Sequence, residues 1–179
     1  KTNLGNNQDP ANAALIISTL GYVSGKVFKD NSVIPNGTFE PGTDTPIVGE
    51  SIELRSGALC TGALLSQAGL TNPVTTDALG NYTFAGLAAG TYSVCQPTQP
   101  AGTTNGSTTA GTITPVAGST GTPGTASNPS GSTSQVVGIV LNANGGGGVS
   151  GSPNNNFAEV VPSSISGTVF LDQNNNGVQ

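Results

Sequence analysis

The sequence has no histidine, methionine or tryptophan, and only 7% of its 179 residues are charged. Without histidine the chain cannot build a Ser-His-Asp triad, and it lacks the commonest metal-binding side chain. Four basic residues against nine acidic ones leave a net charge of −5. Because nucleic-acid binding needs a basic face, this balance predicts no nucleic-acid partner. No nucleophile lies beside a base, so the sequence does not predict an enzyme.

Long apolar runs are missing as well. The best run, residues 13–17, has the length of a strand and falls well short of the ~18 residues that cross a membrane. We therefore expect no membrane insertion. Residues 1–7 lack the apolar core of a secretory signal, which indicates a mature product or an internal fragment.

The sequence is rich in glycine, with 27 residues, and in Ser, Thr and Asn. Short alternating apolar and polar segments, separated by turn signals and without a helical period, predict an all-β sandwich of about seven strands. The predicted strands are residues 22–29, 47–55, 70–76, 82–84, 91–96, 135–141 and 156–161.

Residues 101–134 consist almost wholly of Gly, Ser, Thr, Pro, Ala and Asn. We expect a long loop there, either bare and flexible or decorated with O-linked glycans. Three Asn-x-Ser/Thr sequences, which begin at Asn36, Asn81 and Asn105, fit the acceptor pattern for N-linked glycans, although such sequences also arise by chance.

One segment of the chain occurs twice. Ser24-Gly25-Lys26-Val27-Phe28-Lys29-Asp30 returns near the other end as Ser166-Gly167-Thr168-Val169-Phe170-Leu171-Asp172. A repeat of this kind indicates an array of small modules, which usually spans distance or polymerises. We divide the chain into an N-terminal extension (1–21), a full module (22–162) and the first strand and Asn-rich loop of a following repeat (163–179). The extension is either a strand donated to a neighbour or the end of a preceding repeat.

The two cysteines, Cys60 and Cys95, are too few to bind zinc in a chain without histidine. They form either a disulfide or two free buried thiols. The composition, which suits an extracellular module, favours the disulfide.

Two loops carry oxygen-bearing side chains in a pattern that suits calcium. The loop nearer the end of the sequence is Asp172-Gln173-Asn174-Asn175-Asn176-Gly177. It resembles loops that wrap Ca²⁺ with alternating oxygens around a glycine turn. Its predicted ligands are Asp172, Asn174 and Asn176. The alternative is a plain Asn/Asp/Gly turn.

The corresponding loop of the complete copy runs from Asp30 to Gly37 and is two residues longer. Its predicted ligands are Asp30 and Asn36. Glu40 and Asp44 are the acids expected to close the site, with Asp77 near them in space. Calcium is therefore the one cofactor that we expect.

Five stretches of the chain, in order, resemble the B-type repeats of bacterial surface proteins, which include SdrD B-like and Cna B-type domains. The most specific stretch contains Asp77-Ala78-Leu79-Gly80-Asn81-Tyr82-Thr83-Phe84. The stretches are residues 24–30, 36–42, 76–94, 98–102, and 155–157 with 165–167. The resemblance implies an Ig-like or transthyretin-like sandwich on a bacterial cell surface, in stalks, adhesins or fibres, and generally no enzymatic activity.

Related domains join a first-strand lysine to a last-strand Asn or Asp through an isopeptide bond, with a buried acid to move the proton. The resemblance puts Lys26 or Lys29 and Asn155 or Asn156 in these roles. The acid's position falls on Gln96, which cannot shuttle a proton. We therefore expect ordinary solvated lysines on a strand.

The sequence thus predicts a structural repeat of an extracellular bacterial surface protein. Such modules would build a stalk or filament by stacking head to tail, stiffened by calcium, with neighbouring copies as their partners. The alternative is an adhesin repeat that binds a host protein or a glycan.

Overall fold

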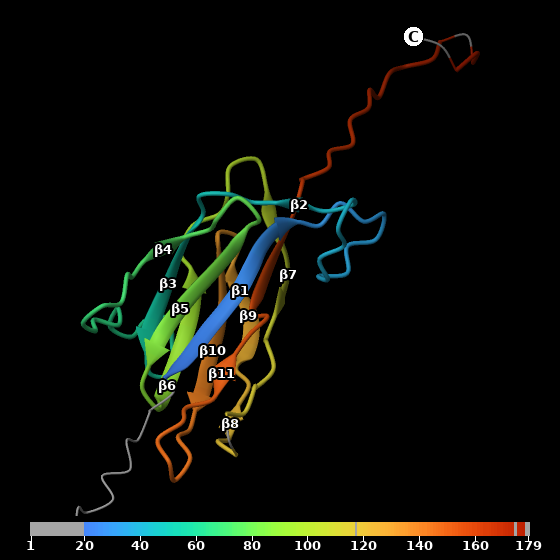
Figure 1. The fold of residues 1–179 in the computed structure, drawn as a ribbon. Helices are drawn as coiled ribbons and strands as arrows, with labels where there is room; N and C mark the ends of the chain where they lie inside the picture. Colours follow the sequence, from blue (N-terminus) through green and yellow to red (C-terminus); the bar gives the residue numbers. More distant parts are fainter. Residues whose placement is uncertain (1–19, 117, 174, 178–179) are drawn as a thin grey trace, which may run out of the picture.

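A computed structural model describes residues 20–116, 118–173 and 175–177 of the chain. Two β-sheets lie face to face in this part of the protein, which contains no helix and hence none that could span a membrane (Figure 1). The predicted all-β sandwich is therefore confirmed. The strand expected within residues 13–19 lies outside the described residues, as does most of the N-terminal extension.

Eight longer strands and four strands of two residues build the sheets of the described chain. They are β1 (Gly21–Lys29), β2 (Thr45–Pro46), β3 (Ser51–Ser56), β4 (Val74–Thr75), β5 (Asn81–Leu87), β6 (Gly90–Gln96), β7 (Thr104–Thr109), β8 (Gly121–Thr122), β9 (Thr125–Ser130), β10 (Thr133–Leu141), β11 (Gly151–Ser152) and β12 (Asn156–Val160).

The first sheet is organised around β1. One edge of β1 pairs antiparallel with β5 and β2, and its other edge pairs parallel with β11 and β12. β12 pairs in turn with β7. The first and last strands of the described sandwich are thus parallel neighbours, with Val27 opposite Phe157 and Lys29 opposite Glu159. The described chain therefore enters the sandwich at one end and leaves it at the other (Figure 1).

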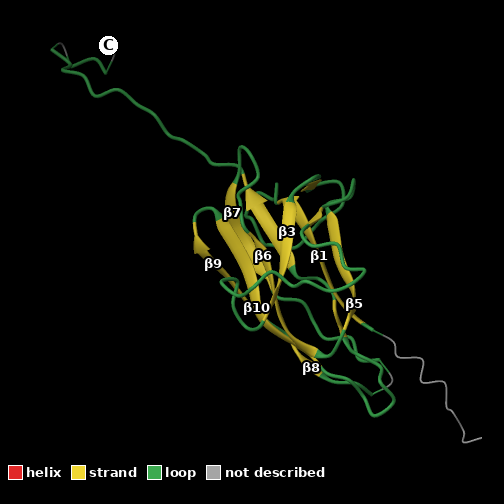
Figure 2. Ribbon diagram, turned by 90° about the vertical axis from the view of Figure 1, so that its left-hand side faces the viewer, coloured by secondary structure: helices red, strands yellow, loops and turns green. Residues whose placement is uncertain are grey.

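The second sheet has the order β4-β3-β6-β10-β8, and β9 also pairs with β10. Figure 2 shows β3, β6 and β10 side by side in this sheet. β3, β6 and β10 are each paired on both edges, and β6 lies in the middle of this order.

The core lies between the sheets, and strands such as β3 and β5 fill it from every second position, whereas β6 and β12 bury consecutive residues. In β5, Tyr82 and Phe84 are buried, while Thr83 between them is exposed. The Tyr82 ring stacks on Phe157 of β12 at a centroid distance of 6.1 Å. Full burial of a large apolar side chain contributes about 1.5–3 kcal/mol, so these rings are a main source of stability.

One close approach in the first sheet requires glycine. A Cβ on Gly25 of β1 would lie 1.7 Å from the carbonyl oxygen of Asn155. The Tyr82 hydroxyl donates a hydrogen bond of 2.5 Å to that same oxygen, and the Asn155 N–H donates to the Ser24 carbonyl at 3.0 Å. β1, β5 and the segment before β12 thus meet at one buried point.

Residues 101–134 are not the long loop that their composition predicts. They contain β7, which pairs with β12, and β8 and β9, which pair with β10. The Asn105 side chain donates to the Ser130 carbonyl at 2.6 Å, and the Asn128 side chain donates to the Gly106 carbonyl at 2.9 Å. Strand pairing uses the backbone and needs no apolar side chain, so a composition without apolar residues conceals these strands.

Two other predicted strands are shorter than expected. Of residues 70–76 only β4 pairs as a strand, and the strand predicted from residue 47 begins at Ser51. Gly49 explains the later start, because its φ of 78° interrupts an extended backbone.

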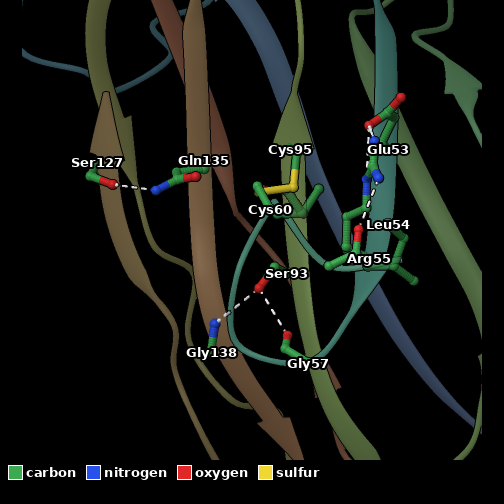
Figure 3. The surroundings of a disulfide bond; sticks show 12 residues. Glu53, Leu54, Arg55, Gly57, Cys60, Ser93, Cys95, Ser127, Gln135 and Gly138 are labelled. Atoms are coloured by element: carbon green, nitrogen blue, oxygen red, sulfur yellow. Dashed lines mark hydrogen bonds and ion pairs between the residues drawn. A yellow bond between two sulfur atoms is a disulfide. The ribbon is translucent and has the colours of Figure 1, made fainter. Parts of the chain in front are cut away.

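Cys60 and Cys95 form a disulfide, as the composition favoured (Figure 3). The bond fastens the segment after β3 onto β6. The Ser93 hydroxyl holds the same segment by donating to the Gly57 carbonyl at 2.9 Å (Figure 3). Two attachments therefore keep this segment against the second sheet.

Replacing both cysteines, Cys60→Ala with Cys95→Ala, should lower the free energy of unfolding by about 3–4 kcal/mol. The physical reason is that the cross-link, which spans 35 residues, no longer restricts the unfolded chain. Denaturant unfolding of the variant and the wild type measures the difference, and reduction of the wild type should produce the same loss. Equal stability with and without the bond would contradict this assignment.

Candidate functional site

Three carboxylates gather in the loop between β1 and β2. Asp30, Glu40 and Asp44 each offer an oxygen, and these oxygens all lie within 4.8 Å of one another. Two oxygens on opposite sides of one calcium ion lie about twice the ~2.4 Å calcium–oxygen bond apart, so this spacing suits oxygens that share one ion. Asp30 and Asp44 are buried and Glu40 is half-buried. The predicted grouping of these three acids is therefore present.

The Asp30 carboxylate is held by the backbone of its own loop. It accepts hydrogen bonds from the N–H groups of Ser32 at 3.1 Å, Asn36 at 2.7 Å and Gly37 at 2.8 Å. Burial pushes the pKa of Asp30 upward, but these hydrogen bonds outweigh burial and lower the pKa below its ordinary value. The carboxylate is thus ionised at neutral pH.

Backbone N–H groups also hold Asp44, whereas side chains hold Glu40. Asp44 accepts from the backbone N–H groups of Asn31 and Glu40, at 2.9 Å and 2.8 Å. Glu40 accepts from the Ser32 hydroxyl at 2.8 Å and from the Asn36 side-chain amide at 2.7 Å. Asn36 therefore lies beside the cluster, as predicted, but it turns its NH₂ group toward Glu40.

Among the described residues, no basic side chain forms an ion pair with the cluster. The one ion pair in the described part of the chain joins Arg55 to Glu53 on β3. Asp30 Oδ2 accepts two hydrogen bonds, whereas Asp30 Oδ1 and both carboxylate oxygens of Glu40 and of Asp44 accept one each and retain a lone pair. A divalent cation bound by oxygen ligands would neutralise this concentration of charge, and calcium fits the donor set.

Asp77, which was expected near these acids, is not part of the cluster. Its carboxylate accepts from the N–H groups of Leu79 at 2.9 Å and Asn81 at 2.8 Å, in the turn that opens β5. The local turn motif thus determines its position. The structure therefore does not bring Asp77 to the three acids that it was expected to lie near.

The second predicted loop closes like the first. The Gly177 N–H donates to the Asp172 carboxylate at 2.6 Å, just as the Gly37 N–H donates to Asp30. Asn176 is exposed in this loop, and Asn174 lies outside the described residues.

The groups considered for an isopeptide bond make other contacts. The Lys26 amine donates to the Leu79 carbonyl and lies 4.5 Å from the centre of the Phe39 ring. The Lys26 backbone N–H donates to the Asn156 side-chain oxygen at 3.0 Å. The Asn155 amide is buried and bonded to the backbone of Ser24, Gly111 and Ser152. These are the contacts of ordinary strand residues.

The three N-glycan acceptor sequences also have engaged side chains. The amide nitrogens of Asn36, Asn81 and Asn105 donate to Glu40, to Asp77 and to the backbone of residues 130–133, respectively. A glycan on any of them would have to replace these bonds.

One buried acid was not singled out from the sequence. Glu159 of β12 is completely buried, and its carboxylate accepts from the side-chain amides of Gln96, at 2.9 Å, and Gln99. Gln96 lies on β6, so these bonds tie the two sheets together. Glu159 lies two residues after the buried Phe157, and side chains two apart in a strand point to the same face. This spacing is the sequence signal that could have placed Glu159 inside.

Glu159 has an unusual acidity. Burial raises its pKa to about 7 against the lowering effect of the Gln99 and Gln96 amides, and the charge of Glu50 adds to the rise. The side-chain oxygens of Gln96 and Gln99 are themselves buried without a hydrogen-bond partner in the described residues. This end of the sandwich therefore contains a buried polar network that is only partly satisfied by hydrogen bonds.

A hollow of about 690 Å³ lies on the outer face of the first sheet. Its lining includes Lys26, Asp77, Asn81, Asn154 and Asn156. Amides and charged groups of both signs give it a polar character with no single dominant charge.

No family model matches the chain, and no curated protein matches it in sequence. The internal repeat and the geometry above are therefore the basis for a functional proposal.

Glu159 should make stability fall as pH rises. Its folded pKa of about 7 exceeds the ordinary 4.5, so its contribution is fully present below about pH 4.5 and is lost as pH rises to about 7. After allowance for solvent screening, we expect a loss on the order of 2 kcal/mol. Thermal unfolding across this range measures it.

Glu159→Gln should flatten that part of the pH profile, because glutamine does not ionise. Glu53→Gln, which removes a carboxyl nearer the surface, is the matched control and should keep the wild-type profile. An unchanged profile in the Glu159 variant would show that another group is responsible.

Proposed function

We propose that this chain is a structural repeat of an extracellular bacterial surface protein, which builds a stalk or filament from β-sandwiches stacked head to tail. The observation that carries the proposal is the return of the β1 sequence in the tail, six residues beyond the end of β12 at Val160. Its resemblance to SdrD B-like and Cna B-type repeats supports the same conclusion. The proposed partners are neighbouring copies of the module, and no enzymatic activity is proposed.

The positions of the chain's entry and exit support a role in bearing load. The described chain enters at the start of β1 and departs after β12, at opposite ends of the sandwich (Figure 1). Consecutive modules joined in this way lie end to end. Tension along the array pulls β1 and β12 past each other, so their parallel backbone bonds are loaded together and not one at a time.

Calcium is proposed as a stiffener of the end from which the tail departs. The Asp30, Glu40 and Asp44 carboxylates are held close together by their own loop, so an ion would require little rearrangement. An ion there would remove the mutual repulsion of three charges and fix the loop against the end of β1.

The second candidate function is adhesion to a host protein or glycan. The hollow beside Lys26 and Asn156 favours it, because amide and charged side chains can bind a polar ligand. It lacks an exposed Tyr or Trp anchor of the kind that dominates protein interfaces, and for that reason the structural role is preferred.

Calcium at millimolar concentration should raise the melting temperature by about 4 °C or more, because it binds the folded loop and not the unfolded chain. Asp44→Asn should abolish the shift, and Asp77→Asn, outside the cluster, should preserve it. Differential scanning calorimetry with calcium, with magnesium and with a chelator makes the comparison. The absence of any shift in the wild type would refute the calcium site.

Electron microscopy of the native material on the cell surface tests the structural role. A regular filament with one sandwich per repeat is the expected result, since opposite ends of the module continue the chain. Single flexible stalks with a distinct tip would mean that the modules are spacers. Material without any repeating unit would overturn the proposal.

A further inference from the structure

The loop between β1 and β2 presents two neighbouring apolar side chains to solvent. Val33 is 102% exposed and Ile34 is 81% exposed, and Pro35 follows them. Single exposed apolar residues are common on proteins. Two adjacent β-branched residues at the tip of a projecting loop are less so, and such groups mark contact surfaces.

The chain contains its own comparison for this loop. The tail loop closes with the same bond from a glycine N–H to an aspartate, between Gly177 and Asp172, and has only Gln and Asn between them. The closure of the loop therefore does not require Val33 or Ile34. Their apolar character needs a different explanation from the turn itself.

The tip is also held in place. Asp44 binds the Asn31 N–H on one side of the tip, and Glu40 binds the Ser32 hydroxyl and the Asn36 amide on both sides of it. Val33 and Ile34 are thus presented by a braced loop and do not fold back onto the sandwich. A braced contact loses less conformational entropy on binding than a flexible one.

The loop and the departing tail lie at the same end of the sandwich (Figure 1). Val161, where the tail begins, is also exposed there. The copy of the β1 sequence starts at Ser166, so a module that begins there would be tethered within a few residues of this end. The end of that module nearest the tether would be the one where β1 begins, and Leu20 is an exposed apolar residue at that end of the described chain.

We propose that Val33 and Ile34 form the contact between one module and the next, and that they pack on the opposite end of a second copy of this chain, around Leu20. The contact would fix neighbouring modules relative to each other and make the array stiff. This inference rests on the proposed structural function, because it takes a second copy as the partner.

Sedimentation of the full 179-residue chain over a range of concentrations tests the contact. The wild type should self-associate, and Val33→Asn with Ile34→Asn, the residue type of the tail loop, should weaken association by at least about tenfold. Leu59→Asn is the matched control, since Leu59 is exposed on the segment held to β6, and it should leave association unchanged. All variants alter exposed residues, so melting temperatures should stay the same.

The partner surface has its own test. Leu20→Asn should weaken association as much as the Val33/Ile34 variant does, and full association of the Leu20 variant would overturn the assignment of the opposite end. A wild type that stays monomeric up to about 1 mM, the concentration a short linker imposes, would overturn the contact itself.

The outcomes separate this inference from the proposed function. A regular fibre on the cell, with association in solution unaffected by the Val33/Ile34 variant, would overturn the contact alone. Association lost in that variant, without any repeating structure on the cell, would support the contact and overturn the filament.

Discussion

The parallel pairing of β1 with β12 is the constraint on which the rest of the structure depends. It joins the beginning and the end of the module through Val27 and Phe157, and it requires the bare backbone of Gly25 beside Asn155. A side chain at Gly25 would separate β1 from the segment that leads into β12. Because the two strands run in the same direction, the described chain enters and leaves at opposite ends, which makes an end-to-end array geometrically simple.

The same pairing concentrates acids at one end of the module. The Asp30 N–H donates to the backbone carbonyl of Glu159 at 2.8 Å, so the acid loop and the buried carboxyl are attached to each other. Their acidities shift in opposite directions, since backbone N–H groups surround Asp30 and burial dominates at Glu159. The protonation of Glu159 therefore makes the stability of this end of the module depend on pH.

Local sequence patterns predicted the features that depend on neighbouring residues. Alternation placed Tyr82 and Phe84 in the core, and the spacing of Asp30, Glu40 and Asp44 along one loop predicted their grouping. The prediction failed at β7, β8 and β9, because their Ser, Thr and Asn side chains do not distinguish a paired strand from a loop. It failed at Asp77 because the carboxylate accepts hydrogen bonds from the backbone of its own turn, which holds it away from the other acids.

By itself the sequence determined the all-β class, the internal repeat and the cysteine pair favoured as a disulfide, since each depends on composition, periodicity or count. Only the tertiary structure decided that β1 lies beside β12, that Glu159 bridges the sheets, and that residues 101–134 complete them. These features arise from contacts between segments far apart in the chain. Their energies depend on burial and on distant hydrogen-bond partners, which no local pattern of residues specifies.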